Sequence, residues 1–108
     1  MRQKIKCQNE VNGIGDPYGG YCEGKGIDIR WQAGPLGIEN QREPNGAFVE
    51  GVIESALQRL EFFQTANNGK FACRQNAIAI TKLEEALMWL DDRTKERVAR
   101  EVEGSMEP

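Results

Sequence analysis

The feature that most constrains this chain is a pair of apolar rows in its second half, separated by the stretch TANNGK at positions 65–70. Within each row the members recur at spacings of three and four, which places them on one face of an α-helix. The first row is Val49, Ile53, Ala56, Leu60 and Phe63. The second row is Cys73, Asn76, Ile80, Leu83, Leu87 and Leu90. Since the asparagines and glycine between the rows suit left-handed turns, the pattern predicts an antiparallel helical hairpin.

The second helix of this hairpin is predicted to be the longer one. Asn45, after Pro44, is predicted as the N-cap of the first helix. A helix of roughly 30 residues then overhangs a partner of roughly 20 residues by ~15 Å, at ~1.5 Å per residue. The apolar row stops at Leu90, whereas Arg93 and Arg97 follow it among acidic residues. We interpret the overhang as a binding surface shared with a second subunit.

The first half of the chain has a different character, because ten of the twelve glycines lie between Gly13 and Gly51. GIDIRWQ, at positions 26–32, alternates apolar and polar residues and predicts a strand. The pair Ile5 and Cys7 gives a weaker strand pattern, and another strand is expected to resume at residues 36–38. The fold class is therefore α+β. A small antiparallel β-unit of residues 1–44 is followed by a long antiparallel helical hairpin of residues 45–108, in one integrated domain.

The glycine-rich stretch NGIGDPYGGYCEGKG at positions 12–26 invites comparison with phosphate-binding loops. After Gly13 and Gly15 the next glycine is Gly19, which fits neither G-x-G-x-x-G nor G-x-x-x-x-G-K-[ST]. No predicted strand precedes it and no helix N-terminus follows it. We interpret it as a flexible hairpin loop.

Composition argues against several function classes. The chain has no histidine, which removes Ser-His triads, His-based acid–base chemistry and the commonest metal ligand. Its net charge of −3 argues against a broad DNA-binding face. The opening MRQKIKCQNE has no apolar segment, so we expect no signal peptide, and no apolar run reaches membrane-spanning length. Three widely spaced cysteines favour a reducing compartment, and we expect no catalytic residues, metal or cofactor.

The sequence also contains three stretches that match a known pattern: GIDIRWQAGPLG, LQRLEFFQ and FACRQNAIAITKLEEALMWLDDRTKERVAREVEG. Together they resemble the Thoeris anti-defence sponge family, the first such phage family described. The similarity extends from Gly26 to Gly104, and its most specific part is the run from Asn76 to Thr94. A related helical hairpin occurs in anti-CBASS sponges.

This resemblance implies a non-enzymatic phage protein that acts in the cytoplasm of the infected bacterial host. Members of the family capture the cyclic ADP-ribose isomers that Thoeris TIR enzymes make, so that the effector is never activated. Members form dimers, and some form hexamers with extra pockets for cyclic dinucleotides or trinucleotides. The resemblance therefore implies glycocyclic ADP-ribose isomers and further copies of this chain as partners, with cyclic dinucleotides and trinucleotides as further candidate ligands.

The resemblance places Asn76 and Arg93 in the ligand pocket, with Arg42 as the matching arginine of the connector. Phe62 and Phe71 are available to stack on a base, and Arg97 adds a cation to the overhang. These residue types suit a ligand that carries a pyrophosphate, an adenine and ribose hydroxyls.

Other interpretations of these residues stay open. Arg93 could belong to a solvated helix face, and Asn76 could fix the register of the hairpin as buried asparagines do in coiled coils. For the whole chain, the alternatives are an anti-CBASS sponge that binds cyclic oligonucleotides and a small coiled-coil interaction protein.

Distance makes one further prediction. Asn76 and Arg93 are 17 positions apart, or ~25 Å along a straight helix, whereas a cyclic ADP-ribose is on the order of 10 Å across. Both residues can contact one ligand if the pocket combines Asn76 of one subunit with Arg93 of another across a two-fold axis.

Overall fold

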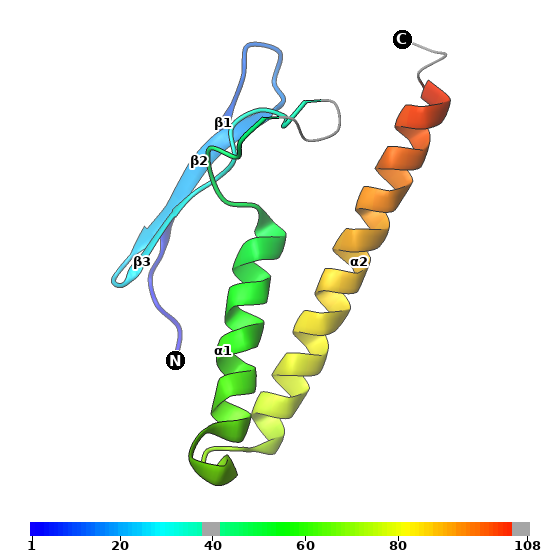
Figure 1. Cartoon of the computed structure of the whole chain (residues 1–108). Coiled ribbons are helices and arrows are strands. Elements are labelled where there is room, and N and C mark those ends of the chain that lie inside the picture. The colour runs from blue at the N-terminus through cyan, green and yellow to red at the C-terminus, as the bar shows by residue number, and fades with distance from the viewer. Residues whose placement is uncertain (38–41, 105–108) are drawn as a thin grey trace. The chain divides into compact units, whose positions relative to one another are not determined.

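The computed structural model describes residues 1–37 and 42–104, with side chains as far as residue 100. Three strands, β1 (Lys6–Val11), β2 (Pro17–Gly24) and β3 (Ile27–Arg30), precede two helices, α1 (Val49–Gly69) and α2 (Arg74–Gly104). Two compact units result, Met1–Val49 and Glu50–Pro108 (Figure 1). The predicted α+β class, a small antiparallel sheet followed by a helical hairpin, is confirmed.

The sheet has the order β1-β2-β3, and both pairs of neighbours are antiparallel. The predicted strand in GIDIRWQ is β3, and the weaker pattern around Cys7 falls on β1. In β3 the apolar Ile27 and Ile29 are half-buried while Asp28 and Arg30 are exposed, so the alternation marks the two faces of the sheet.

The glycine-rich stretch is a hairpin, but the prediction of a flexible loop is wrong for most of it, because residues 17–24 form β2. The turn before β2 is closed by Asn12, whose side-chain oxygen accepts hydrogen bonds from the Ile14 and Asp16 amides, each at 3.0 Å. Within β2, Gly20 has a φ of 126°, and a Cβ there would lie 2.3 Å from the carbonyl oxygen of Gln8. Only glycine fits so close to β1, at the point where the register of the two strands becomes irregular.

The connector after β3 folds back on the end of that strand. Ala47 forms a parallel bridge with Trp31, and its amide donates to the Arg30 carbonyl at 2.7 Å. Gly46 lies so close that a Cβ would be 2.6 Å from the Trp31 carbonyl. The prediction of Asn45 as a helix N-cap is wrong, because its side chain bonds the backbone amide and carbonyl of Ala33 at 2.8 and 3.0 Å. The first helix therefore begins four residues later, at Val49.

The sequence predicts a strand at residues 36–38. Leu36 and Gly37 do not belong to a strand, and Ile38 lies outside the described residues.

In the second unit, α1 and α2 run antiparallel and are joined at the end drawn lowest in Figure 1. Ala66 leaves the helical region, and Asn67 and Asn68 have positive φ values of 51° and 56°. TANNGK therefore ends the helix as predicted. The tip is then fastened by Gln64, whose side-chain amide accepts from the Cys73 backbone amide at 3.0 Å and donates to the Cys73 carbonyl at 3.2 Å.

The far end of the hairpin is marked by an ion pair between α2 and the first turn of α1. A guanidinium nitrogen of Arg93 lies 4.0 Å from a carboxylate oxygen of Glu50. Residues 94–104 of α2 therefore continue beyond the start of α1, by about 16 Å at the rise of an α-helix. No helix in the described part of the chain has the length and apolar character needed to cross a membrane.

The less exposed positions of the two helices follow the predicted apolar rows with one shift. On α2, the row from Asn76 to Leu90 is half-buried as predicted, although Cys73 is exposed. On α1, Leu57 is the buried residue at 5% exposure, whereas Val49 and Ala56, which the predicted row included, are exposed. The inward face of α1 is thus rotated by about one residue from the predicted one. Among the described residues Leu57 is the only buried apolar side chain, so the hairpin has a thin core of its own.

Candidate functional site

The six candidate binding residues fall into three places. Phe62, Phe71 and Asn76 lie around the tip of the hairpin, where α1 ends and α2 begins. Arg93 and Arg97 lie toward the other end of α2. Arg42 belongs to the connector of the first unit.

The tip presents exposed aromatic rings next to cations. Phe62 is 52% exposed and Phe71 is 56% exposed. The Arg59 guanidinium lies 5.2 Å from the ring centroid of Phe62, and the Lys70 ammonium lies 5.6 Å from that of Phe71. Aromatic faces of this kind can stack on a base, and the neighbouring cations can attract a phosphate. A base that stacks on Phe62 must use the face that Arg59 does not cover, or displace Arg59.

Arg59 and Lys70 were not among the predicted site residues. Arg59 also lies 4.9 Å from the ring centroid of Phe63, which is one helical turn away. Residues three and four apart on a helix are neighbours, so this spacing in LQRLEFFQ could have identified Arg59 from the sequence. Lys70 follows the left-handed turn, whose path the apolar periodicity does not specify.

Asn76 lies in the first turn of α2. Its backbone amide donates to the Cys73 sulfur at 3.4 Å, which helps begin the helix. Its side chain is half-buried and, within the described part of the chain, makes no hydrogen bond to protein. A half-buried amide in this state can still accept and donate hydrogen bonds to a ligand or to a second chain.

Arg93 and Arg97 are one turn apart on α2, and both are exposed. The side chain of Arg93 is 62% exposed, and its separation from Glu50 is at the long limit for an ion pair. A pair of this kind holds an arginine weakly, so that a pyrophosphate can compete for it. Since α2 is one unbroken helix, Asn76 and Arg93 of one chain are about 25 Å apart along its axis.

Arg42 is exposed. Its backbone amide donates to the Leu36 carbonyl at 2.9 Å. Gly37 has a φ of 86°, and a Cβ there would lie 3.7 to 3.9 Å from the Arg42 side chain. Such a distance is ordinary van der Waals contact, so the positive φ favours glycine here and the arginine does not need the space.

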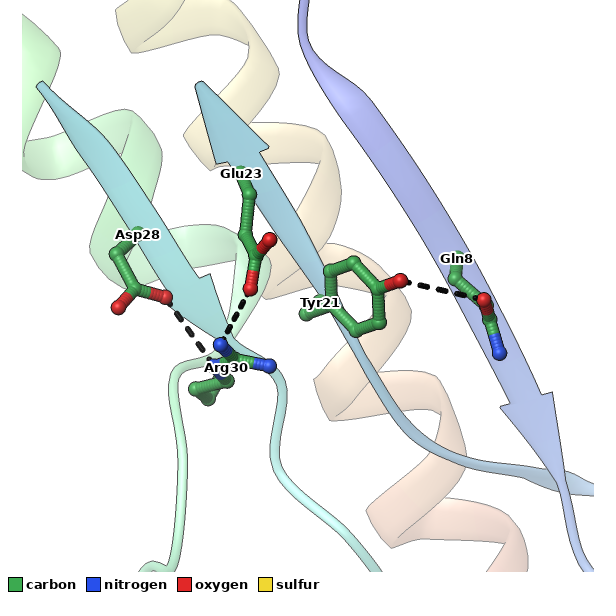
Figure 2. A network of polar contacts seen from close by, with 5 residues as sticks. All are labelled: Gln8, Tyr21, Glu23, Asp28 and Arg30. Atoms are coloured by element: carbon green, nitrogen blue, oxygen red, sulfur yellow. Dashed lines mark hydrogen bonds and ion pairs between the residues drawn. The ribbon is translucent and has the colours of Figure 1, made fainter. Parts of the chain in front are cut away.

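Arg30, a further arginine of the first unit, is already neutralised on the polar face of the sheet (Figure 2). It pairs with Glu23 of the neighbouring strand and with Asp28, 3.1 Å away, and lies 5.0 Å from the ring centroid of Tyr21. Tyr21 in turn donates to Gln8 on β1 at 3.3 Å. Because two carboxylates already neutralise this arginine, it is a poor candidate for binding an anion. Its contacts instead help to hold the three strands together.

The chain is similar to a known phage protein and to a family of hairpin domains. A family model described as the hairpin domain of Acb2/Tad1 matches residues 23–95. The protein named Thoeris anti-defense 1, of Bacillus phage SBSphiJ7, is 48% identical over 84 residues. That alignment covers 78% of this chain and 55% of the relative, so the chain spans about half of the relative's length. The family match includes Asn76 and Arg93 and leaves β1 and most of β2 outside.

Proposed function

This chain belongs to the family of the Acb2/Tad1 hairpin domain, and on that premise we propose that it is a phage anti-defence sponge. In this proposal it binds cyclic ADP-ribose-type immune signals, chiefly glycocyclic isomers, in the cytoplasm of an infected bacterium. It sequesters them without degrading them and thereby blocks Thoeris immunity. The observation that carries the proposal is the match over residues 23–95, which is supported by the name of the phage relative.

The chemistry of the hairpin supports capture without turnover. A cyclic ADP-ribose offers an adenine, a pyrophosphate and several hydroxyls. Exposed rings at Phe62 and Phe71, the amide of Asn76 and the guanidinium of Arg93 are matched to these three kinds of group. None of these side chains is an activated nucleophile or a general base.

The length of α2 favours a pocket made by two chains. A ligand on the order of 10 Å across cannot reach both Asn76 and Arg93 of one straight helix that separates them by about 25 Å. In an isologous dimer, Asn76 of one chain and Arg93 of the other can converge, and the two-fold axis then creates two identical pockets. The thin core of the hairpin is also consistent with an assembly that buries more apolar surface.

Binding without turnover is tested by recovery of the ligand. The protein is incubated with each candidate signal, separated by filtration and heated, and the released compound is assayed by mass and by activation of a Thoeris effector. We expect depletion of glycocyclic ADP-ribose from the filtrate and full recovery after heating. Time-dependent loss of the cyclic compound would instead identify an enzyme.

The role of Arg93 is tested with a matched neighbour. Loss of a charge-assisted contact worth ~1.5–3 kcal/mol should weaken affinity by roughly 10- to 150-fold in Arg93→Ala. Lys95→Ala is the control, because this lysine lies two residues further along α2 and, among the described residues, pairs with Asp91 of its own helix, at 3.0 Å. If the two variants bind glycocyclic ADP-ribose with equal affinity, Arg93 belongs to a solvated helix face and does not bind the ligand.

The two-chain pocket is tested by complementation. An Asn76→Ala chain is mixed with an equal amount of an Arg93→Ala chain, and subunit exchange is verified by native mass spectrometry. Half of the dimers are then mixed, and each has one pocket with both lesions and one with neither, so about a quarter of the wild-type number of tight sites should return. No recovery despite exchange would place the pocket within one chain.

An anti-CBASS sponge is the second candidate, because the matching family model is described jointly for Acb2 and Tad1. It would capture cyclic dinucleotides or trinucleotides with the same hairpin. Including these compounds in the filtration assay separates the two candidates, and a hexamer with both activities would show independent saturation by each ligand class.

A further inference from the structure

Two cysteines face each other across the β1–β2 hairpin, outside the segment that matches the family. Cys7 and Cys22 are direct partners in the strand register, and their sulfur atoms are 2.8 Å apart. Both are thiols in this structure, Cys7 exposed and Cys22 half-buried. The third cysteine, Cys73, belongs to the helical unit.

The geometry of this pair suits a covalent bond. Directly opposed residues of antiparallel strands have Cα atoms about 4.5–5.5 Å apart, which is within the range of about 4.4–6.8 Å that disulfides span. A disulfide of about 2.05 Å needs the two sulfur atoms to approach by less than 1 Å from their present separation. Small rotations of two side chains at the surface of a sheet can supply that movement.

We propose that Cys7 and Cys22 are a reversible redox site, a dithiol that is oxidised to a cross-strand disulfide by a low-molecular-weight disulfide. The proposal is independent of the proposed function. One cysteine thiolate attacks a sulfur of the small disulfide and releases one small thiolate. The second cysteine thiolate then attacks the mixed disulfide and releases the other. The two cysteines lose two electrons and two protons, and the small disulfide gains them as two thiols.

The contact between the sulfurs also sets how the reaction responds to pH. The hydrogen bond with Cys22, followed by desolvation and the charge of Cys22, raises the pKa of the Cys7 thiol. Since only the thiolate attacks, a raised pKa lowers its fraction at neutral pH, and the rate of oxidation should rise as the pH becomes alkaline.

Closure of the disulfide should act on β1. Every residue of β1 is exposed, and β2 is its one hydrogen-bonded neighbour in the sheet. A covalent link in the middle of the hairpin removes openings in which β1 leaves β2. The oxidised chain should therefore exchange its β1 amide hydrogens more slowly than the reduced chain.

The test uses the full chain with Cys73→Ser, which leaves the two thiols of the pair. The protein is incubated in buffers of reduced and oxidised glutathione, quenched with an alkylating agent and weighed by mass spectrometry. We expect a two-electron transition to a species that has lost two hydrogens, carries no alkyl group and carries no glutathione. Because the second exchange is intramolecular, the mixed disulfide should stay below about a tenth of the protein.

The controls are Cys7→Ser and Cys22→Ser in the same background. Each has one thiol, so it should stop at a mixed disulfide with glutathione and show no slowing of β1 amide exchange. The proposal is overturned if the two-thiol protein also accumulates glutathione adducts, forms disulfide-linked dimers, or keeps both thiols under conditions that modify the single-thiol variants.

Discussion

The β-unit and the helical hairpin are held together by different means. In the β-unit, backbone atoms approach so closely at Gly20 and Gly46 that a single methyl group cannot be placed there. In the hairpin, half-buried side chains recur every three or four residues along one face of each helix, here called the seam, and Leu57 is the one buried apolar residue of the described chain. The first unit therefore depends on the absence of side chains at particular points, whereas the second depends on a repeated pattern that tolerates exchange of its members.

The largest effect is expected at Gly20 of the β-unit. In Gly20→Ala the Cβ would meet the Gln8 carbonyl at 2.3 Å and force a residue with a side chain to a φ of 126°. Steric overlap and backbone strain together should cost about 2–5 kcal/mol, enough to separate β1 from β2. Amide exchange of β1 and urea unfolding measure the loss.

Gly13→Ala is the matched control in the same hairpin, because nothing lies within 4 Å of its Cβ position. It should change the free energy of unfolding by no more than about 0.5 kcal/mol. If both variants unfold alike, close approach is not what holds the β-unit. If Gly20→Ala also removes the far-UV helical signal, the hairpin depends on the β-unit.

A smaller loss is expected from Leu57→Ala in the hairpin. Leucine-to-alanine changes in protein cores cost about 2–5 kcal/mol, and a seam with one exposed side can relax, so we expect about 2–3 kcal/mol. Met88→Ala removes a side chain of similar size that is 60% exposed on α2, and should cost about 0.5 kcal/mol or less. Equal losses in the two variants, measured by urea unfolding, would mean that α2 buries Met88 in an assembly.

The same contrast explains how much of each unit the sequence predicted. The hairpin was predictable because its apolar rows repeat every three or four residues. The stretch TANNGK also contains asparagines and a glycine, which favour a left-handed turn. The inward face of α1 was misplaced because Ala56 and Leu57 are adjacent, and either fits the spacing. Periodicity therefore predicts which face of a helix is buried only to within about one residue.

The β-unit was only partly predictable. The alternation in β3 identified that strand, but β2 contains Gly19, Gly20 and Gly24, which carry no apolar pattern and resemble a loop. Asn45 looked like a helix cap because capping and loop-bridging use the same side-chain oxygen, and its partner Ala33 is remote in sequence. The resemblance supplied three of the candidate binding residues, Asn76, Arg93 and Arg42. Residue type and position supplied the other three, Phe62, Phe71 and Arg97, because exposed arginines and phenylalanines have no periodicity that distinguishes them.

The tip of the hairpin should contribute less than its seam. Gln64→Ala removes both hydrogen bonds to the Cys73 backbone and should cost about 1–2 kcal/mol, because each net hydrogen bond is worth about 0.5–1.5 kcal/mol. Gln58→Ala is the matched control, since within the described part of the chain the Gln58 side chain bonds the Glu54 side chain one turn away, at 3.0 Å, and no other group. Urea unfolding of the two variants should differ by about 1 kcal/mol, and no difference would show that the turn residues alone close the tip.

The smallest effect on stability is expected from Glu50→Gln, a change that also tests how Arg93 binds the ligand. The Arg93–Glu50 pair joins exposed side chains at 4.0 Å, so Glu50→Gln should change the free energy of unfolding by no more than about 0.5 kcal/mol. If Arg93 binds the pyrophosphate, Glu50 competes with the ligand for the same guanidinium. Its neutralisation should then raise affinity by up to about twofold, an effect that shrinks at high salt.

Glu54→Gln, on the same helix and bonded to Gln58, is the control that changes charge equally without touching Arg93. Calorimetric titration of both variants at low and high salt separates a local effect from one of net charge. A loss of affinity in Glu50→Gln would show that the carboxylate positions Arg93 for the ligand, and α1 would then help to build the site at Arg93.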